Sequence, residues 1–175
     1  THEKLLFRLK KTDGTMSMVF LKKEKLENEE NIVKGFVMNG EKKIGYIVLP
    51  GFYTEWENET GSGCANDIAK EIIKLKRENI DGLILDVRYN GGGSLGEAMD
   101  MIGIFVEEGP LCARKDRTGK LTTLKDPNRG TIYDGPLALM INTQSASASE
   151  LLAASLKDYH RAVIVGSNTH GKATM

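Results

Sequence analysis

The alternation of hydrophobic and polar positions changes near residue 32. Before it, two alternating runs at residues 5–9 and 16–21 flank an Asp13-Gly14 pair, which is favoured in the turn between two paired strands. The following segment, residues 22–31, is dominated by charged side chains and is typical of a solvated linker. Because a lone hairpin is only marginally stable, we interpret residues 1–31 as the remnant and linker of an upstream domain.

The remaining residues, 32–175, alternate between strand and helix patterns. Strands are predicted at 44–49, 83–87, 137–141 and 162–165, and helices at 65–79, from Ser94 and from Ser147. The polar stretch at 115–130 is assigned no element. This alternation predicts an α/β domain with a mixed, largely parallel sheet. The turns that follow the strands at 83–87 and 137–141 should then lie at the same edge of that sheet, where such folds place their sites.

Composition narrows the class of protein. Apolar residues make up 40% of the 175 positions and charged residues 27%, so the chain can bury a core. Lysine plus arginine (24) balance aspartate plus glutamate (24), which gives no reason to expect a nucleic acid or an anionic membrane as partner. The apolar runs are far shorter than the roughly 20 residues that cross a bilayer. We expect Cys64 and Cys112 to be free, and no signal sequence is recognisable at Thr1.

A serine marks the start of the last predicted helix. Ser147 and Glu150 form a capping-box pattern, and Ser147 could serve only as that cap. A serine at this place also lies beside the first free N–H groups of the helix. The Ala148 N–H could therefore stabilise the oxyanion that forms when Ser147 attacks a carbonyl. A second source of N–H groups is the glycine run at 91–93, which otherwise serves a tight turn.

A nucleophilic serine needs a base, and several residues are candidates. His2 lies at the chain terminus, and His160 follows a helix end, where it is expected to act as a cap. His170 and Lys172 remain open as bases; a lysine needs burial or a neighbouring cation to be neutral, and a partly buried setting is expected for Lys172. Residues 166–172 also nearly fit the phosphate-binding pattern G-x-x-x-x-G-K, but Ala173 stands where Ser or Thr should bind magnesium.

Three separated motifs resemble the tail-specific or C-terminal processing proteases of peptidase family S41. Residues 86–93, D-V-R-Y-N-G-G-G, resemble the family's D-x-R-x-N-x-G-G loop, residues 145–150, S-A-S-A-S-E, its nucleophile motif, and residues 166–172 its lysine motif. The resemblance covers residues 44–175 and implies that Ser147 is the nucleophile and Lys172, 25 positions later, the base. It also associates Asp158 with activity, a residue that otherwise pairs with Arg161 on the surface.

The resemblance carries further expectations. It implies a core like that of Clp protease and crotonase, an oxyanion hole from Gly93 (or Gly92) with the Ala148 N–H, and no cofactor or metal. It implies that residues 1–31 end a PDZ domain that gathers polypeptides with apolar C-terminal tails, in the periplasm or another extracytoplasmic compartment. The glutamine that often orients the lysine would fall one place beyond Met175, so we expect residues 1–175 alone to be poorly active. A non-catalytic ligand-binding relative, or a nucleotide-binding protein, is the alternative.

Overall fold

The chain forms two compact units, Thr1–Asn31 and Ile32–Met175, in a computed structural model that describes residues 4–22, 33–54, 63–125 and 130–174. The first unit contains the predicted hairpin, in which β1 (Lys4–Lys10) pairs antiparallel with β2 (Met16–Lys22). Its turn is stabilised by Asp13, whose carboxylate accepts the Thr15 N–H at 2.9 Å. The predicted linker lies, apart from Lys22, outside the described residues, and the PDZ origin of the hairpin stays a prediction.

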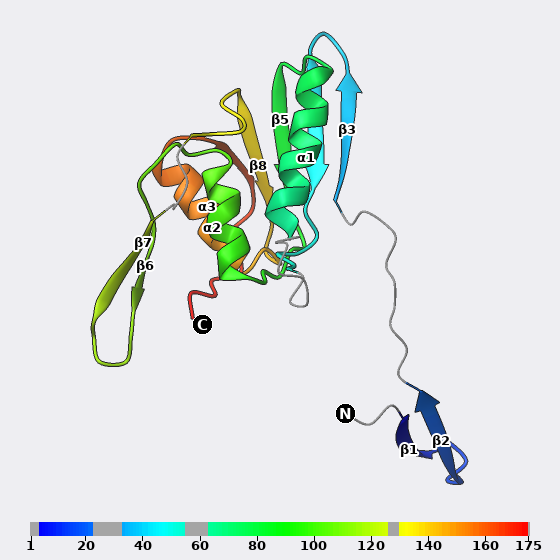
Figure 1. Cartoon of the computed structure of the whole chain (residues 1–175). Helices are drawn as coiled ribbons and strands as arrows, with labels where there is room; N and C mark the ends of the chain where they lie inside the picture. Colours follow the sequence, from blue (N-terminus) through cyan, green and yellow to red (C-terminus); the bar gives the residue numbers. More distant parts are fainter. Residues whose placement is uncertain (1–3, 23–32, 55–62, 126–129, 175) are drawn as a thin grey trace. The chain divides into compact units, whose positions relative to one another are not determined.

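The second unit is built on a five-stranded sheet in the order β3-β4-β5-β8-β9 (Figure 1). Antiparallel pairing joins β3 to β4, whereas β4, β5, β8 and β9 pair in parallel, which confirms the mixed, largely parallel sheet. The strand bounds are Lys34–Asn39 for β3, Lys43–Val48 for β4, Gly82–Asp86 for β5, Leu137–Ile141 for β8 and Val163–Gly166 for β9.

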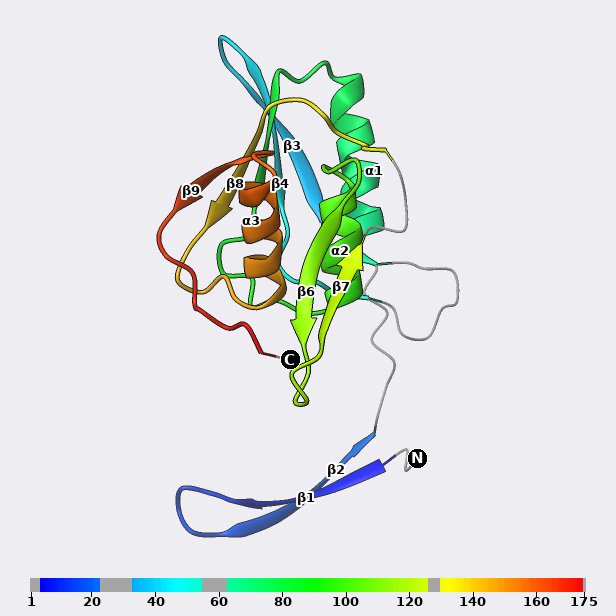
Figure 2. The ribbon, with the colours of Figure 1, turned by 90° about the vertical axis from the view of Figure 1, so that its left-hand side faces the viewer.

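The three helices in the described part of this unit lie on one face of the sheet, as the two views in Figures 1 and 2 show. The helices are α1 (Cys64–Arg77), α2 (Leu95–Gly103) and α3 (Ala148–Asp158). Each strand-to-strand step in the order β4, β5, β8, β9 moves in the same direction, so right-handed crossovers put every connecting helix on the same side. The polypeptide between neighbouring strands therefore returns over one face only.

The side chains on the face of the sheet that the helices cover are buried. Ile47, Leu85 and Leu139 are register partners on neighbouring strands, and each is 0% exposed beneath the helices. Burying one such side chain stabilises the fold by about 1.5–3 kcal/mol. The residues one place earlier point to the other face, and the last strand there presents Val163, which is 67% exposed. The hydrophobic core thus lies between the sheet and the helices.

The structure also contains strands that the sequence pattern did not predict. One is β3, and the others are β6 (Pro110–Lys115) and β7 (Leu121–Lys125), which form a hairpin in and beside the polar stretch that was assigned no element. Most residues of that hairpin are exposed, so no hydrophobic alternation marks its strands.

Cys64 and Cys112 are free, as expected. Within the described part of the chain, no helix has the length and apolarity to cross a membrane.

Candidate active site

Two loops meet at the carboxyl edge of the sheet. The glycine loop, residues 87–94, follows β5, and the serine loop, residues 142–147, follows β8. Because β5 and β8 are adjacent and parallel, their loops leave the same edge, as the sequence predicted. The Tyr89 N–H donates to Asn142 Oδ1 at 3.0 Å, and the Ala146 N–H donates to the Asn90 carbonyl at 3.0 Å. The two loops are therefore hydrogen-bonded directly to each other.

The outer serines of the S-A-S-A-S-E motif serve the structure. Ser145 is 0% exposed and donates its hydroxyl to the Val87 carbonyl at 2.8 Å. Ser149 is also 0% exposed and donates to the Asn90 carbonyl at 2.9 Å. The middle serine, Ser147, is half-buried and reaches the surface. The fold thus uses two serines to bind the glycine loop and presents the third to solvent.

Asn90 links three segments of the site from a fully buried position. Its side-chain amide donates to the Leu49 carbonyl, just after β4, at 2.9 Å. Its Oδ1 accepts the Gly92 N–H at 2.9 Å. Its main-chain carbonyl accepts from the serine loop and from Ser149, as described above. A buried side chain whose oxygen and nitrogen are both hydrogen-bonded holds its surroundings in one arrangement, so Asn90 fixes the path of the glycine loop.

Ser147 has a strained backbone. Its φ of 58° and ψ of −112° lie outside the regions that L-residues with side chains favour, and such a residue costs about 1–3 kcal/mol. The Ser147 N–H donates to Glu150 Oε2 at 2.7 Å, so the carboxylate half of the predicted capping box is formed. The surrounding hydrogen bonds hold this conformation, which sets the hydroxyl at the tip of a sharp turn between the serine loop and α3.

Candidate oxyanion donors lie next to this serine. A Cβ built on Gly92, whose φ is +101°, would lie 2.8 Å from Ser147 Cβ and 3.1 Å from the Ala148 nitrogen. The Gly92 N–H itself donates to Asn90, so it is not a free donor here. Among the hydrogen bonds of the described residues, none uses the N–H of Gly93 or of Ala148. Gly93 and Ala148 therefore suit the oxyanion hole, and Gly92 provides the space.

A partly buried ion pair lies at the base of the glycine loop, with Asp86 buried and the Arg88 side chain 39% exposed. Asp86, 4% exposed, binds the Arg88 guanidinium at 2.7 Å and accepts a hydrogen bond from the Tyr46 hydroxyl. Burial alone would raise the pKa of the Asp86 carboxyl, but the hydrogen bonds from Arg88 and Tyr46 outweigh it and hold that pKa below its usual value. The pair orients the chain as it leaves β5. Motif comparison marks Asp86 and Arg88, but the sequence alone assigned them no role.

Glu150 joins the serine to the loop that carries Lys172. This lysine loop, residues 167–174, follows β9. Glu150 Oε2 accepts the N–H of Ser147 at 2.7 Å and the N–H of Lys172 at 2.8 Å, while Oε1 accepts the Gly171 N–H at 2.6 Å. The backbones of the candidate nucleophile and the candidate base therefore share one carboxylate oxygen. Sequence reasoning treated Glu150 only as a helix cap and missed this role, because the lysine loop is distant in the sequence.

The charge of Glu150 is favoured by these contacts. Partial burial would raise the pKa of its carboxyl, but hydrogen bonds from the Thr169 side chain and from the backbone of Gly171, Ser147 and Lys172 outweigh that effect. Its pKa therefore lies below the ordinary value.

The lysine loop is also bound to the serine loop by a contact that does not involve Glu150. The His170 N–H donates to the Ser145 carbonyl at 3.0 Å.

The side chain of Lys172 does not complete the dyad in this structure. It is exposed, contrary to the partly buried setting expected from the sequence, and no hydrogen bond joins its amine to Ser147 among the described residues. The lysine loop is attached by the backbone N–H groups of His170, Gly171 and Lys172 and by the Thr169 side chain, and these contacts leave the Lys172 side chain exposed. The structure thus brings the two backbones together and leaves the lysine amine in solvent.

Asp158 is not brought to the site. It is the last residue of α3, an 11-residue helix that begins just after Ser147, so it lies about 16 Å away at a rise of roughly 1.5 Å per residue. The expected pair with Arg161 is also not formed, because Arg161 donates to the carbonyls of Phe105 and Tyr133. The ring of His160 lies 3.0 Å from the Asp158 carbonyl, in agreement with a capping role.

The phosphate-binding interpretation of residues 166–172 does not fit the geometry. A P-loop leaves its backbone N–H groups free to surround phosphates and leads into a helix. Here the N–H groups of Gly171 and Lys172 donate to Glu150, and described residues 167–174 contain no helix. An anion in this loop would compete with a carboxylate that the chain itself supplies.

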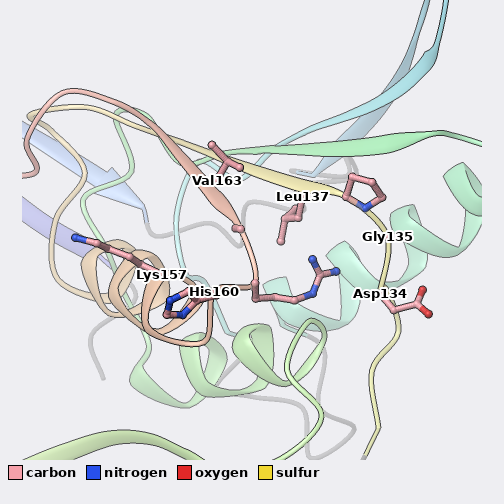
Figure 3. Close-up of a pocket in the computed structure, with 9 residues that line it drawn as sticks. Asp134, Gly135, Leu137, Lys157, His160 and Val163 are labelled. Carbon is pink, nitrogen blue, oxygen red and sulfur yellow. The ribbon is translucent and has the colours of Figure 1, made fainter.

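A shallow pocket of about 600 Å³ lies away from this site (Figure 3). It is lined where β8 begins and α3 ends, by residues that include Asp134, Leu137, Lys157, His160 and Val163. Ser147 is at the other end of α3 and at the other end of β8. The pocket is therefore separate from the candidate active site.

Comparison with known proteins identifies the family to which the chain belongs. The family model described as peptidase family S41 matches residues 43–175. The chain belongs to peptidase family S41. It is 36% identical over 163 residues to the tail-specific protease of Haemophilus influenzae, an alignment that covers 93% of this chain and 22% of that protein. It is 35% identical over 117 residues to a "Probable CtpA-like serine protease" of Staphylococcus epidermidis, covering 66% of this chain and 24% of the relative.

Solved structures show the same fold. The photosystem II D1 C-terminal processing protease superposes with a TM-score of 0.68 at 26% identity, over 90% of this chain and 41% of that one. Mature CPAF, solved with lactacystin, superposes with a TM-score of 0.62 at 16% identity, over 99% of this chain and 55% of that one, and supports the fold alone. The S41 chain described here thus spans less than a quarter of the length of the two curated relatives that it matches.

Proposed function

We propose that this S41 chain carries the catalytic core of a serine endopeptidase in which Ser147 is the nucleophile and Lys172 the general base. The observation that carries the proposal is the Glu150 carboxylate, one oxygen of which accepts both the Ser147 and the Lys172 N–H. This shared contact anchors the two residues side by side from loops that are separated by α3 and β9. The long, flexible stem of lysine allows its amine to turn from solvent toward the Ser147 hydroxyl.

The proposed reaction proceeds through an acyl-enzyme. The neutral amine of Lys172 takes the hydroxyl proton while Ser147 Oγ attacks the peptide carbonyl. The negative charge on the tetrahedral intermediate is stabilised by the N–H groups of Ala148, which follows Ser147 directly, and of Gly93, which follows the Gly92 that lies against Ser147. Lys172 then returns the proton to the leaving amine, and a water molecule releases the acyl group by the reverse route.

The substrate class is proposed from the relatives. Proteins named as a tail-specific protease and as a C-terminal processing protease are among the best-matching chains. We therefore propose polypeptides with apolar C-terminal tails as substrates, cleaved near their C-termini. The proposed compartment is the periplasm or another extracytoplasmic space. The expected PDZ remnant at residues 1–31 belongs to the same proposal.

Cleavage of an unfolded reporter with an apolar C-terminal tail tests the dyad in the full-length protein. Ser147→Ala and Lys172→Ala should each lose nearly all activity, because one removes the nucleophile and the other its base. Ser167→Ala and Lys157→Ala are matched controls, since both residues are exposed and no hydrogen bond between described residues joins either one to Ser147. His170→Ala should remain active. Mass spectrometry of protein quenched during turnover should find the acyl group on Ser147.

Two results would contradict the proposal. An inert wild-type protein would make the family relationship one of fold alone and favour a non-catalytic ligand-binding role. Loss of activity in His170→Ala together with activity in Lys172→Ala would move the base from lysine to histidine.

A further inference from the structure

The β6–β7 hairpin concentrates positive charge that the proposed catalytic machinery does not use. The chain as a whole has 24 basic and 24 acidic residues, so this concentration is local. The exposed cationic side chains of the hairpin and its turn are Arg114, Lys115, Arg117, Lys120 and Lys125. None of the three salt bridges between described residues involves any of them.

The one acidic residue of the hairpin uses its carboxylate within the turn and offsets only part of this positive charge. Asp116 is the one acidic residue between positions 110 and 125, and its carboxylate is committed to the turn. Its Oδ1 accepts the Thr118 N–H at 2.8 Å, the Thr118 hydroxyl at 2.6 Å and the Lys120 N–H at 3.0 Å. The aspartate therefore shapes the turn and interacts electrostatically with Arg114, while the cationic side chains of the hairpin remain exposed.

The hairpin is attached to α3 and extends along the direction in which β5 and β8 run. Its base is bound to α3, because Ser155 donates to the Leu111 carbonyl at 3.0 Å and Tyr159 donates to the Pro110 carbonyl at 2.9 Å. From there it runs toward the end of the core at which β5 and β8 finish and the lysine loop lies, in both Figure 1 and Figure 2. The hairpin therefore extends beyond the same end of the core as the loops of the candidate active site.

We propose that the β6–β7 hairpin is a docking arm for acidic stretches of the polypeptide substrate. The inference rests on the proposed protease function and adds a charge preference to it. Positive side chains attract carboxylates over roughly 8 Å at physiological ionic strength. The hairpin is a two-stranded sheet, so its outer strand edges also offer backbone groups to an extended peptide. It has no aromatic side chain on which a nucleic-acid base could stack.

A charge-removal variant of the full-length protein tests the arm. Arg114→Gln, Arg117→Gln and Lys120→Gln are combined, and a matched control combines Lys34→Gln, Lys42→Gln and Arg77→Gln, which are exposed on β3, the β3–β4 turn and α1. Two reporters share one apolar tail and differ upstream, where one carries Asp and Glu and the other Asn and Gln. KM for the acidic reporter should rise about fivefold in the hairpin variant only. The kcat values and the neutral reporter should be unchanged.

Binding gives a readout that does not depend on turnover. In a Ser147→Ala background, fluorescence anisotropy should show tighter binding of the acidic reporter than of the neutral one, with a difference that shrinks as salt rises. Equal KM values for both reporters in the hairpin variant and the wild type would overturn the docking arm while leaving the protease proposal intact. Loss of affinity for anionic phospholipid vesicles without any change in peptide cleavage would also overturn it. If the wild type cleaves neither reporter, the protease proposal itself fails.

Discussion

The serine loop and the lysine loop both reach Glu150, yet they are held in different ways. The serine loop is held from inside the core, by the buried Ser145 hydroxyl on the Val87 carbonyl and by the buried Ala146 N–H on the Asn90 carbonyl. The lysine loop lies on the surface and is attached through backbone N–H groups, to Glu150 and to the Ser145 carbonyl. The nucleophile side is therefore part of the core, while the position of the base depends mainly on one carboxylate.

This difference separates two kinds of contribution to the site. Substitutions around the serine loop disturb buried hydrogen bonds or packing and should change the free energy of unfolding. Substitutions at the Glu150–lysine-loop contact should change activity with a smaller effect on stability, because few core contacts depend on that loop. The following experiments test this contrast, beginning with the largest expected effect.

Gly92→Ala should produce the largest loss. The new Cβ would lie 2.8 Å from Ser147 Cβ and from the Ala146 carbonyl oxygen, and the φ of +101° would strain any residue with a side chain. We expect kcat/KM to fall by about 100-fold or more, the scale seen when an oxyanion hole is damaged. The reporter assay measures it. Gly91→Ala is the matched control, since an added Cβ there has no atom within 4 Å; equal losses in both variants would contradict the assignment.

Glu150→Gln should detach the lysine loop while the serine loop stays in place. The N–H groups of Ser147, Gly171 and Lys172 converge on two carboxylate oxygens, and an amide offers only one oxygen and turns its NH₂ toward a donor. We expect activity to fall by about 10-fold or more, with faster hydrogen exchange at the Gly171 and Lys172 amides. Glu41→Gln, on the exposed β3–β4 turn, is the control. Unchanged exchange at both amides would show that Glu150 does not hold the loop.

Replacing Ser145 or Ser149, the outer serines of the motif, should lower the free energy of unfolding by different amounts. Ser145→Ala leaves the Asn142 N–H without its acceptor, although the Val87 carbonyl still accepts the Asn90 N–H, and should cost about 1–3 kcal/mol of unfolding free energy. Ser149→Ala should cost less, about 0.5–1.5 kcal/mol, because the Asn90 carbonyl still accepts from Ala146. Urea unfolding measures both, with the exposed Ser167→Ala as reference. A reversed order would mean that packing, not hydrogen bonding, sets these costs.

Acid should loosen the lysine loop before the serine loop. Glu150 has a pKa below its ordinary value, so its contacts stabilise the folded state above about pH 4.3, the usual glutamate value. That contribution is lost as the pH falls below this value through the lowered folded pKa. The NMR signals of the Gly171 and Lys172 amides should shift in this range, whereas the Ala146 amide, which donates to a carbonyl, should not. Glu150→Gln should abolish the shift; its persistence would assign the titration to another group.

Local patterns accounted for much of the fold. The Asp13-Gly14 turn, the strand at 137–141 and the helix beginning after Ser147 all depend on residues that are near one another in the sequence, and each was found where the pattern put it. The β6–β7 hairpin was missed because its strands are exposed and show no hydrophobic alternation. Its stability comes instead from the Asp116 turn and from contacts with α3, which local periodicity does not report.

For the candidate site, the sequence supplied the residue types and their order. The capping pattern and the motif resemblance singled out Ser147 and the lysine 25 positions later, and the alternation of strands and helices put two loops at one sheet edge. Those inferences depend on short-range backbone preferences and on the direction of parallel strands. Both can be predicted from residues that are close together in the sequence.

Only the tertiary structure decided which groups face one another. It buried Ser145 and Ser149 beneath the glycine loop, used the Gly92 N–H for Asn90, and brought the lysine loop to Glu150. It also put Asp158 a full helix away from Ser147 and left the Lys172 side chain in solvent. These outcomes depend on hydrogen bonds between segments that are distant along the chain. Such contacts form only when the sheet and its crossovers have set the loops side by side, so no local pattern encodes them.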